Sequence, residues 1–97
     1  MTAMPMPEYE VVCLCAAWCN TCTEYRPGFE GLAPDFPRAS FKWLDTEDDA
    51  EEIGELAVED VENFPTILVK HGSQTLFYGP QPPSPDILKR LLETLIK

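Results

Sequence analysis

Apolar and polar positions alternate along the chain in a way that predicts short strands between helices. Residues 11–17 form a continuous apolar run that begins with two valines, which is typical of a strand buried on both faces. From Asn20 onward the apolar residues recur at helical spacing, and they are Cys22, Tyr25, Phe29, Leu32 and Ala33. Pro27 lies inside this helical segment and lacks a backbone donor, so we expect the helix to bend near Arg26.

A second strand and a second helix are predicted in the middle of the chain. Residues 40–45 read as a strand whose bulk comes from Phe41, Trp43 and Leu44. Thr46 and the acidic residues 47–49 have the composition of a helix N-terminus, and this helix is expected to continue to about Val58. Its apolar stripe is Ala50, Ile53, Leu56 and Ala57. Like charges four residues apart weaken it, so it must depend on tertiary packing.

The last third of the chain predicts a hairpin followed by a helix. Residues 66–69 and 75–78 are β-rich runs, and the loop between them has a length suited to antiparallel pairing. Ser84 is the expected N-cap of a C-terminal helix and Pro85 its first residue. The apolar stripe of this helix is Ile87, Leu88, Leu91, Leu92 and Leu95.

The element order βαβαββα predicts an α/β fold in one domain that covers residues 1–97. A strand, a helix and a strand in succession imply parallel pairing of the first two strands, and the hairpin adds antiparallel strands to the same sheet. We therefore expect a central mixed four-stranded sheet flanked by three helices, with both of its faces covered.

The charge balance limits the partners of this chain. Its formal net charge is −10, which repels nucleic acid and anionic membrane surfaces. The acidic residues between Lys42 and Lys70 form a negative face, which is either a solvated helix surface or a surface that steers a basic partner. No apolar stretch is long enough to span a membrane, and residues 1–7 lack the pattern of a secretory signal. We expect neither a nucleic-acid nor a membrane partner.

Four cysteines lie within ten residues of one another, and they are Cys13, Cys15, Cys19 and Cys22. Such a cluster cannot tie distant parts of the chain together, so it is not the disulfide framework of a secreted protein. It fits a reducing cytosol, where clustered cysteines are more often catalytic or metal-binding. We therefore expect a cytoplasmic location.

Cys19 and Cys22 lie three residues apart at the start of the first predicted helix. This spacing places both thiols on one face, close enough to form a disulfide reversibly. A thiolate at Cys19 would be stabilised by the positive end of the helix dipole, which makes Cys19 the attacking sulfur. Cys22, one turn further in, would be more buried and would resolve the mixed disulfide. This chemistry requires no metal and no organic cofactor.

Several further motifs resemble the thioredoxin family, from about Tyr9 to the C-terminus. The segment Ala16-Ala17-Trp18-Cys19 is similar to the start of its active site, Pro27 matches its helix-kinking proline, and Phe64-Pro65-Thr66 resembles its cis-proline loop. Gly72 and Gly79 match family glycines. The resemblance implies a minimal thioredoxin fold and a thiol-disulfide oxidoreductase that reduces protein disulfides. It also implies a monomer and a thioredoxin-reductase-like electron donor.

The resemblance also implies where a substrate would bind. The cis-proline loop would face Cys19, and the Phe64 backbone would hydrogen-bond an extended substrate segment as an added strand. Trp18 would be a flat apolar contact beside the cysteine pair. The implied substrate-binding residues are therefore Trp18, Phe64, Pro65 and Thr66.

The chain also departs from the family pattern. It lacks the strand and helix that precede this core in full thioredoxins, so the first strand is expected near the sheet edge. Cys13 occupies the place of a buried aspartate and Phe41 that of its partner lysine, so the usual aid to deprotonation of the buried cysteine is absent. Cys13 and Cys15 share one strand face and suit core packing. Cys13 is also a candidate modulator that forms an alternative disulfide with Cys22 or regulates it.

Two other functions compete with the redox enzyme. The four cysteines could hold Zn²⁺ or another soft ion, although their spacing is too compressed for two separated pairs of ligands. The chain could also be a noncatalytic adaptor that binds a partner through the surface around Trp18 and Pro65 or through its acidic helix. An intact cysteine pair argues against the adaptor, because pure binding needs no second thiol.

Overall fold

The computed structural model describes residues 8–16, 19–55, 65–72 and 74–96. The described elements follow the order predicted from the sequence. They are β1 (Tyr9–Cys15), α1 (Asn20–Gly31), the 3₁₀ turn η1 (Ala33–Asp35), β2 (Ala39–Asp45), α2 (Ala50–Glu55), β3 (Thr66–His71), β4 (Gln74–Pro80) and α3 (Pro85–Leu95). Pro27 lies inside α1, as expected.

The four strands form one mixed sheet in the order β2-β1-β3-β4. β1 is parallel to β2, with Val11 opposite Phe41, and antiparallel to β3, with Leu14 opposite Thr66. The first strand was expected near the sheet edge, and β1 lies second in the order, next to the edge strand β2. β1 has a hydrogen-bonded neighbour on each side, in agreement with its continuous apolar run, and the edge strands are β2 and β4.

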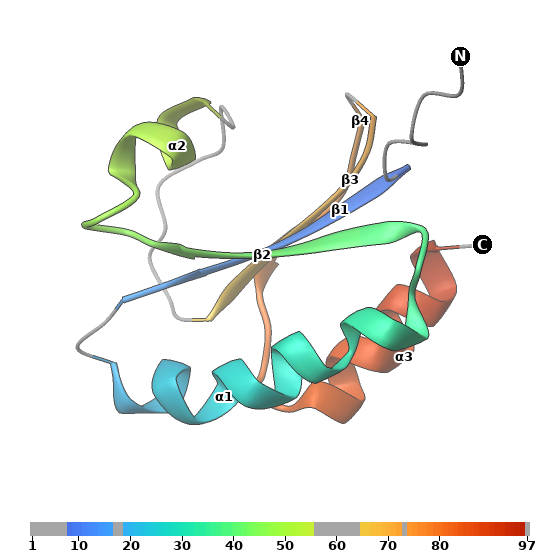
Figure 1. Cartoon of the computed structure of the whole chain (residues 1–97), viewed down its shortest axis with the longest axis horizontal. Helices are drawn as coiled ribbons and strands as arrows, with labels where there is room; N and C mark the ends of the chain where they lie inside the picture. Colours follow the sequence, from blue (N-terminus) through green and yellow to red (C-terminus); the bar gives the residue numbers. More distant parts are fainter. Residues whose placement is uncertain (1–7, 17–18, 56–64, 73, 97) are drawn as a thin grey trace, which may run out of the picture.

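Helices cover both faces of the sheet, as predicted, because successive residues of β1 point to opposite sides. Figure 1 places α1 and α3 together on one face and α2 on the other. Val11, Cys13 and Cys15 belong to the core under α1 and α3. Val12 and Leu14 belong to a smaller core that Ile53 of α2 packs against.

The larger core contains an aromatic cluster between α1 and β2. Phe29 of α1 is fully buried, and its ring meets Phe41 and Trp43 edge-on at centroid distances of 5.4 and 5.7 Å. Edge-to-face contacts of this kind add roughly 0.5–1.5 kcal/mol to area burial. On the same helix, Gly28 packs against Pro85 so closely that a Cβ would overlap the Pro85 ring. α1 and α3 therefore meet where the Gly28 backbone faces the Pro85 ring.

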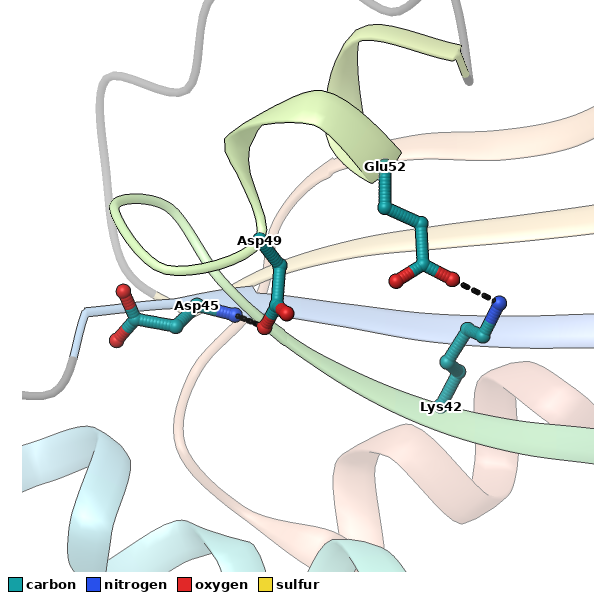
Figure 2. A network of polar contacts seen from close by, with 4 residues as sticks. All are labelled: Lys42, Asp45, Asp49 and Glu52. Atoms are coloured by element: carbon teal, nitrogen blue, oxygen red, sulfur yellow. Dashed lines mark hydrogen bonds and ion pairs between the residues drawn. The ribbon is translucent and has the colours of Figure 1, made fainter.

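In the acidic segment after β2, the helix begins later than predicted. Residues 46–49 form turns and α2 starts at Ala50, while Leu56, Ala57 and Val58 lie outside the described residues. The Asp45 carboxylate accepts hydrogen bonds from the Glu47 and Asp48 amides at 2.8 and 2.9 Å. Figure 2 shows the Asp45 amide bonded to the Asp49 carboxylate at 2.8 Å, and the ion pair between Lys42 and Glu52 that joins β2 to α2. The bonds from the Glu47 and Asp48 amides to the Asp45 side chain form a turn of the Asx type, which precedes α2.

The hairpin strands are longer than predicted. β3 continues through His71 and β4 begins at Gln74, so the two residues pair directly. Gly72 has a φ of 62°, a backbone conformation that favours glycine. Ser84 is the N-cap of α3, as expected, although its side chain makes no capping hydrogen bond. None of the described helices is long and apolar enough to cross a membrane.

Candidate functional site

The four cysteines gather where β1 ends and α1 begins. Cys19 is the N-cap of α1 and is half-buried, whereas Cys22, one turn further on, is 1% exposed. Cys13 and Cys15 point from β1 toward α1 and are 0% and 1% exposed. Cys22 is therefore more buried than Cys19, as we expected from the sequence.

A disulfide joins Cys22 to Cys15, with a Cα separation of 5.9 Å. Cys13 and Cys19 are free thiols, and the Cys13 Sγ lies 3.5 Å from the Cys15 Sγ. The structure therefore differs from the sequence-based expectation, in which Cys22 bonds to Cys19. It also places Cys15, and not Cys13, as the alternative partner of Cys22.

The position of Cys15 explains this pairing. It is the last residue of β1, and the strand alternation points it to the same face as Cys13. Cys13 lies two residues further back along the strand, at a rise of roughly 3.3 Å per residue, and so is further from the start of α1. The alternation of side chains along the strand, which showed in the sequence that Cys13 and Cys15 share a face, could also have identified Cys15 as a neighbour of Cys22.

Cys13 stays protonated at neutral pH, because burial raises the pKa of its thiol far above the usual value. Phe41, on the neighbouring strand, contributes an aromatic ring to the core beside Phe29. Neither residue supplies the acid or base that the family places in this region. Deprotonation of Cys22 has no carboxylate to assist it from these two positions.

Tyr25 brings a polar atom into the same core. Its side chain is 2% exposed, and among the described residues no hydrogen-bond partner lies within reach of its hydroxyl. Burial raises the pKa of Tyr25, and the negative charge of an ionised Cys13 raises it further. Tyr25 and Cys13 belong to the same buried core.

A pocket of about 370 Å³ opens beside Cys22. Its lining contains three carboxylates and one cation, and it consists of Ala16, Cys22, Thr23, Arg26, Trp43, Asp45, Asp48 and Asp49. The Arg26 guanidinium lies 5.3 Å from the centre of the Trp43 ring, a cation–π distance. The sequence did not identify this pocket, because its walls come from four segments: the residue after β1, α1, β2 and the turn before α2.

The described substrate-loop residues lie at the same end of the sheet as the cysteines. Thr66 pairs with Leu14, so Pro65 follows the ladder on the side of Cys15. Both side chains are buried, and the Pro65 carbonyl accepts a hydrogen bond from the Gln81 amide at 3.1 Å. Trp18 and Phe64 lie outside the described residues. The substrate-binding roles of all four residues remain predictions.

The cysteine cluster is not arranged as a metal site in the part of the chain that the structure describes. Among residues 8–16, 19–55, 65–72 and 74–96, no group of three or more Cys, His, Asp or Glu side chains could hold a metal ion. A bond between Cys15 and Cys22 uses two of the sulfurs that such an ion would need.

Known structures match this chain along most of its length. The germline-specific thioredoxin Deadhead of Drosophila melanogaster matches with a TM-score of 0.75 at 19% identity, over 93% of this chain and 83% of that one. Thioredoxin O2 of Arabidopsis thaliana, in the oxidised state, gives 0.72 at 25% identity over 94% and 77%. The thioredoxin of Trypanosoma brucei brucei gives 0.73 at 24% identity over 94% and 79%. Neither a family model nor the sequence of a curated protein matches.

These matches confirm the resemblance and the fold class: the chain has a minimal thioredoxin fold, with four strands and three helices. Cysteines at positions 19 and 22 give it the CxxC spacing in that fold. Fold and cysteines together support a thiol-disulfide oxidoreductase in general. The roles of the individual sulfurs depend on the local chemistry, since a fold alone does not fix a function.

Proposed function

We propose that this chain reduces protein disulfides by dithiol–disulfide exchange, with Cys19 as the nucleophile and Cys22 as the resolving cysteine. The observation that carries the proposal is the position of Cys19, a free and half-buried thiol at the N-cap of α1. At this position the side chain lies at the positive end of the helix dipole. Buried Cys22 follows one turn later on the same side of the helix.

The reaction proceeds through two exchanges. The Cys19 thiolate attacks one sulfur of the substrate disulfide, and the other substrate sulfur leaves as a thiolate. Cys22 then attacks the Cys19 sulfur of this mixed disulfide and releases the second substrate thiolate. The substrate gains two electrons and the chain holds one disulfide, which an electron donor of the thioredoxin-reductase type would reduce. The resolving step requires Cys22 to be free, so the Cys15–Cys22 bond must be open during turnover.

The surroundings of Cys22 favour a particular kind of substrate. Asp45, Asp48 and Asp49 line the pocket beside it, and the whole chain carries a net charge of −10. A disulfide flanked by basic residues would be attracted to this end of the sheet. The predicted contacts Trp18, Phe64, Pro65 and Thr66 would hold the substrate backbone. We place this reaction in the cytoplasm, on the grounds of the clustered cysteines.

Reduction of insulin, with dithiothreitol as the electron source, tests the proposal. The wild-type chain should accelerate the reaction, and the Cys19→Ser variant should lose that acceleration because a hydroxyl is not a comparable nucleophile at neutral pH. Glu24→Ser, an exposed change on the same helix, is the matched control and should keep it. Equal rates for wild type and Cys19→Ser would contradict the catalytic proposal and favour the noncatalytic adaptor.

A further inference from the structure

Three buried sulfurs form a chain of contacts under the first turn of α1. Cys22 is bonded to Cys15, and Cys13 lies 3.5 Å from Cys15. None of the three residues is more than 1% exposed. The proposed function uses only one of them, Cys22, so the other two sulfurs need a separate explanation.

We propose that Cys15 is a third redox-active sulfur, and that Cys22 exchanges its bond between Cys19 at the surface and Cys15 in the core. The inference rests on the proposed function, because oxidation by a substrate supplies the Cys19–Cys22 disulfide from which the exchange starts. Cys22 is suited to be the common partner, because it lies one helical turn from Cys19 and is bonded to Cys15 here.

The exchange conserves electrons and protons. The Cys15 thiolate attacks the Cys22 sulfur, the Cys22–Cys15 bond forms, and the Cys22–Cys19 bond breaks. The electron pair of the broken Cys22–Cys19 bond goes to the Cys19 sulfur, which leaves as a thiolate. In the reverse direction the Cys19 thiolate attacks Cys22 and Cys15 leaves. One disulfide and one thiol are present before and after, so no oxidant or reductant is consumed.

Cys13 is placed to assist this exchange. The Cys15 sulfur carries no hydrogen when it is bonded to Cys22. The 3.5 Å contact is therefore an S–H···S hydrogen bond that the Cys13 thiol donates to the Cys15 sulfur. The same donor would stabilise Cys15 when it leaves as a thiolate in a buried environment. Cys13 is therefore a positioning residue of the exchange, and it remains protonated while Cys15 changes state.

Burial makes Cys19 the only described sulfur through which the core bond can be opened easily. Cys15 and Cys22 are each 1% exposed, so an external thiol has little access to either of them. Cys19 is half-buried and can react both with solvent and with Cys22. In the Cys15–Cys22 state the disulfide would thus be buried in the core, and Cys19 would be a free thiol.

Disulfide mapping of the oxidised wild-type chain tests the location of the bond. The protein is oxidised with diamide, quenched in acid, blocked with N-ethylmaleimide and cleaved by chymotrypsin, which cuts after Trp18 and Tyr25. A Cys15–Cys22 bond links the peptide ending at Trp18 to residues 19–25, whereas a Cys19–Cys22 bond leaves these peptides separate. We expect the linked form to predominate, with the maleimide on Cys13 and Cys19. Detection of the unlinked form alone would overturn the inference.

The Cys19→Ser variant tests the exchange itself. Its Cys15–Cys22 bond should still form, as mapping would verify, but dithiothreitol should reduce it at least about tenfold more slowly than in the wild type, because access to the buried bond is lost. In denaturing urea both proteins should be reduced at the same rate. Equal rates in native buffer would contradict a role of Cys19 in opening the bond.

The two proposals fail in different ways. If insulin reduction depends on Cys19 and no linked peptide forms, the exchange is wrong and the proposed function stands. If the linked peptide forms but the wild type does not reduce insulin, the proposed function is wrong, and the Cys15–Cys22 bond serves stability alone. Disulfide mapping and the insulin reaction of the wild type need no variant, so these two readouts do not depend on a protein that might misfold.

Discussion

Gly28 of α1 lies directly against the Pro85 ring at the start of α3, with no room for a Cβ between them. We expect Gly28→Ala to push the two helices apart and to lower the free energy of unfolding by about 1–3 kcal/mol, as overpacking does. Urea denaturation measures this change. The cost of the overlap should exceed the roughly 1 kcal/mol by which alanine stabilises a helix relative to glycine.

Gly31 on the same helix provides the control. A Cβ at this position meets nothing within 4 Å, so Gly31→Ala should be neutral or stabilise by up to about 1 kcal/mol. If both variants changed stability in the same direction and by the same amount, the contact between Gly28 and Pro85 would not be what limits the packing.

Removal of the resolving sulfur should trap a covalent intermediate. In Cys22→Ser the mixed disulfide between Cys19 and the substrate cannot be resolved, so a substrate peptide should remain bound and be released by dithiothreitol. Mass spectrometry of the acid-quenched reaction measures the adduct. Wild type should show it only transiently, and an adduct on Cys13 or Cys15 would contradict the assignment of Cys19 as nucleophile.

The unpartnered hydroxyl of Tyr25 should cost stability. Its Oη is buried, and no described group is within hydrogen-bonding distance of it. Tyr25→Phe removes this atom and keeps the ring that packs against Phe29. We expect an increase of about 1 kcal/mol in the free energy of unfolding, because an unsatisfied buried polar group carries a desolvation penalty of roughly 1–3 kcal/mol. A loss of stability would indicate a partner for the hydroxyl.

The stability of the chain should fall at alkaline pH. Burial raises the pKa of Cys13 in the folded state, whereas in the unfolded chain its thiol ionises near its ordinary value of 9.0. As the pH rises past 9, the unfolded state therefore binds fewer protons from this group than the folded state, and the free energy of unfolding decreases by a total of about 1.4 kcal/mol between pH 8 and about 10. Denaturation of wild type and Cys13→Ala between pH 8 and about 10 measures the difference, and parallel curves would contradict it.

The rate of substrate reduction should depend on salt. The chain has a net charge of −10, and three aspartates line the pocket beside Cys22. Reduction of a peptide disulfide with lysine-rich flanks should slow several-fold as ionic strength rises from about 0.01 to 0.5 M, because the attraction is screened. A glutamate-rich peptide should respond in the opposite sense. Identical salt dependence for the two peptides would exclude steering by the acidic surface.

The order of the elements could be predicted from the sequence, and some details of their ends could not. Apolar patterning identified the described strands and α-helices, because each buries a continuous run or a regular stripe of apolar residues, whereas the 3₁₀ turn η1 was not predicted. The start of α2 was placed too early, since composition at Thr46 does not reveal that the Asp45 carboxylate binds the following amides.

The spacing of residues in the sequence was sufficient to place Cys19 and Cys22. It was not sufficient to identify the residues that lie next to them in the fold. The helix N-terminus fixes where these two thiols lie, so their positions and relative burial followed from the sequence. The partner of Cys22 is a tertiary relationship between the end of β1 and the start of α1. The pocket beside Cys22 likewise depends on how α1, β2 and the segment before α2 come together.

The bond between Cys15 and Cys22 also links the motions of two elements. β1 is an interior strand, and amides in such strands exchange with solvent only when large parts of a domain open. The first turn of a helix, by contrast, frays readily. When the bond is formed, that turn is anchored to an interior strand, so the exchange of its amides should slow toward the rate of the amides in the sheet. Reduction would release it, and the local order at the start of α1 would then report the redox state of the core.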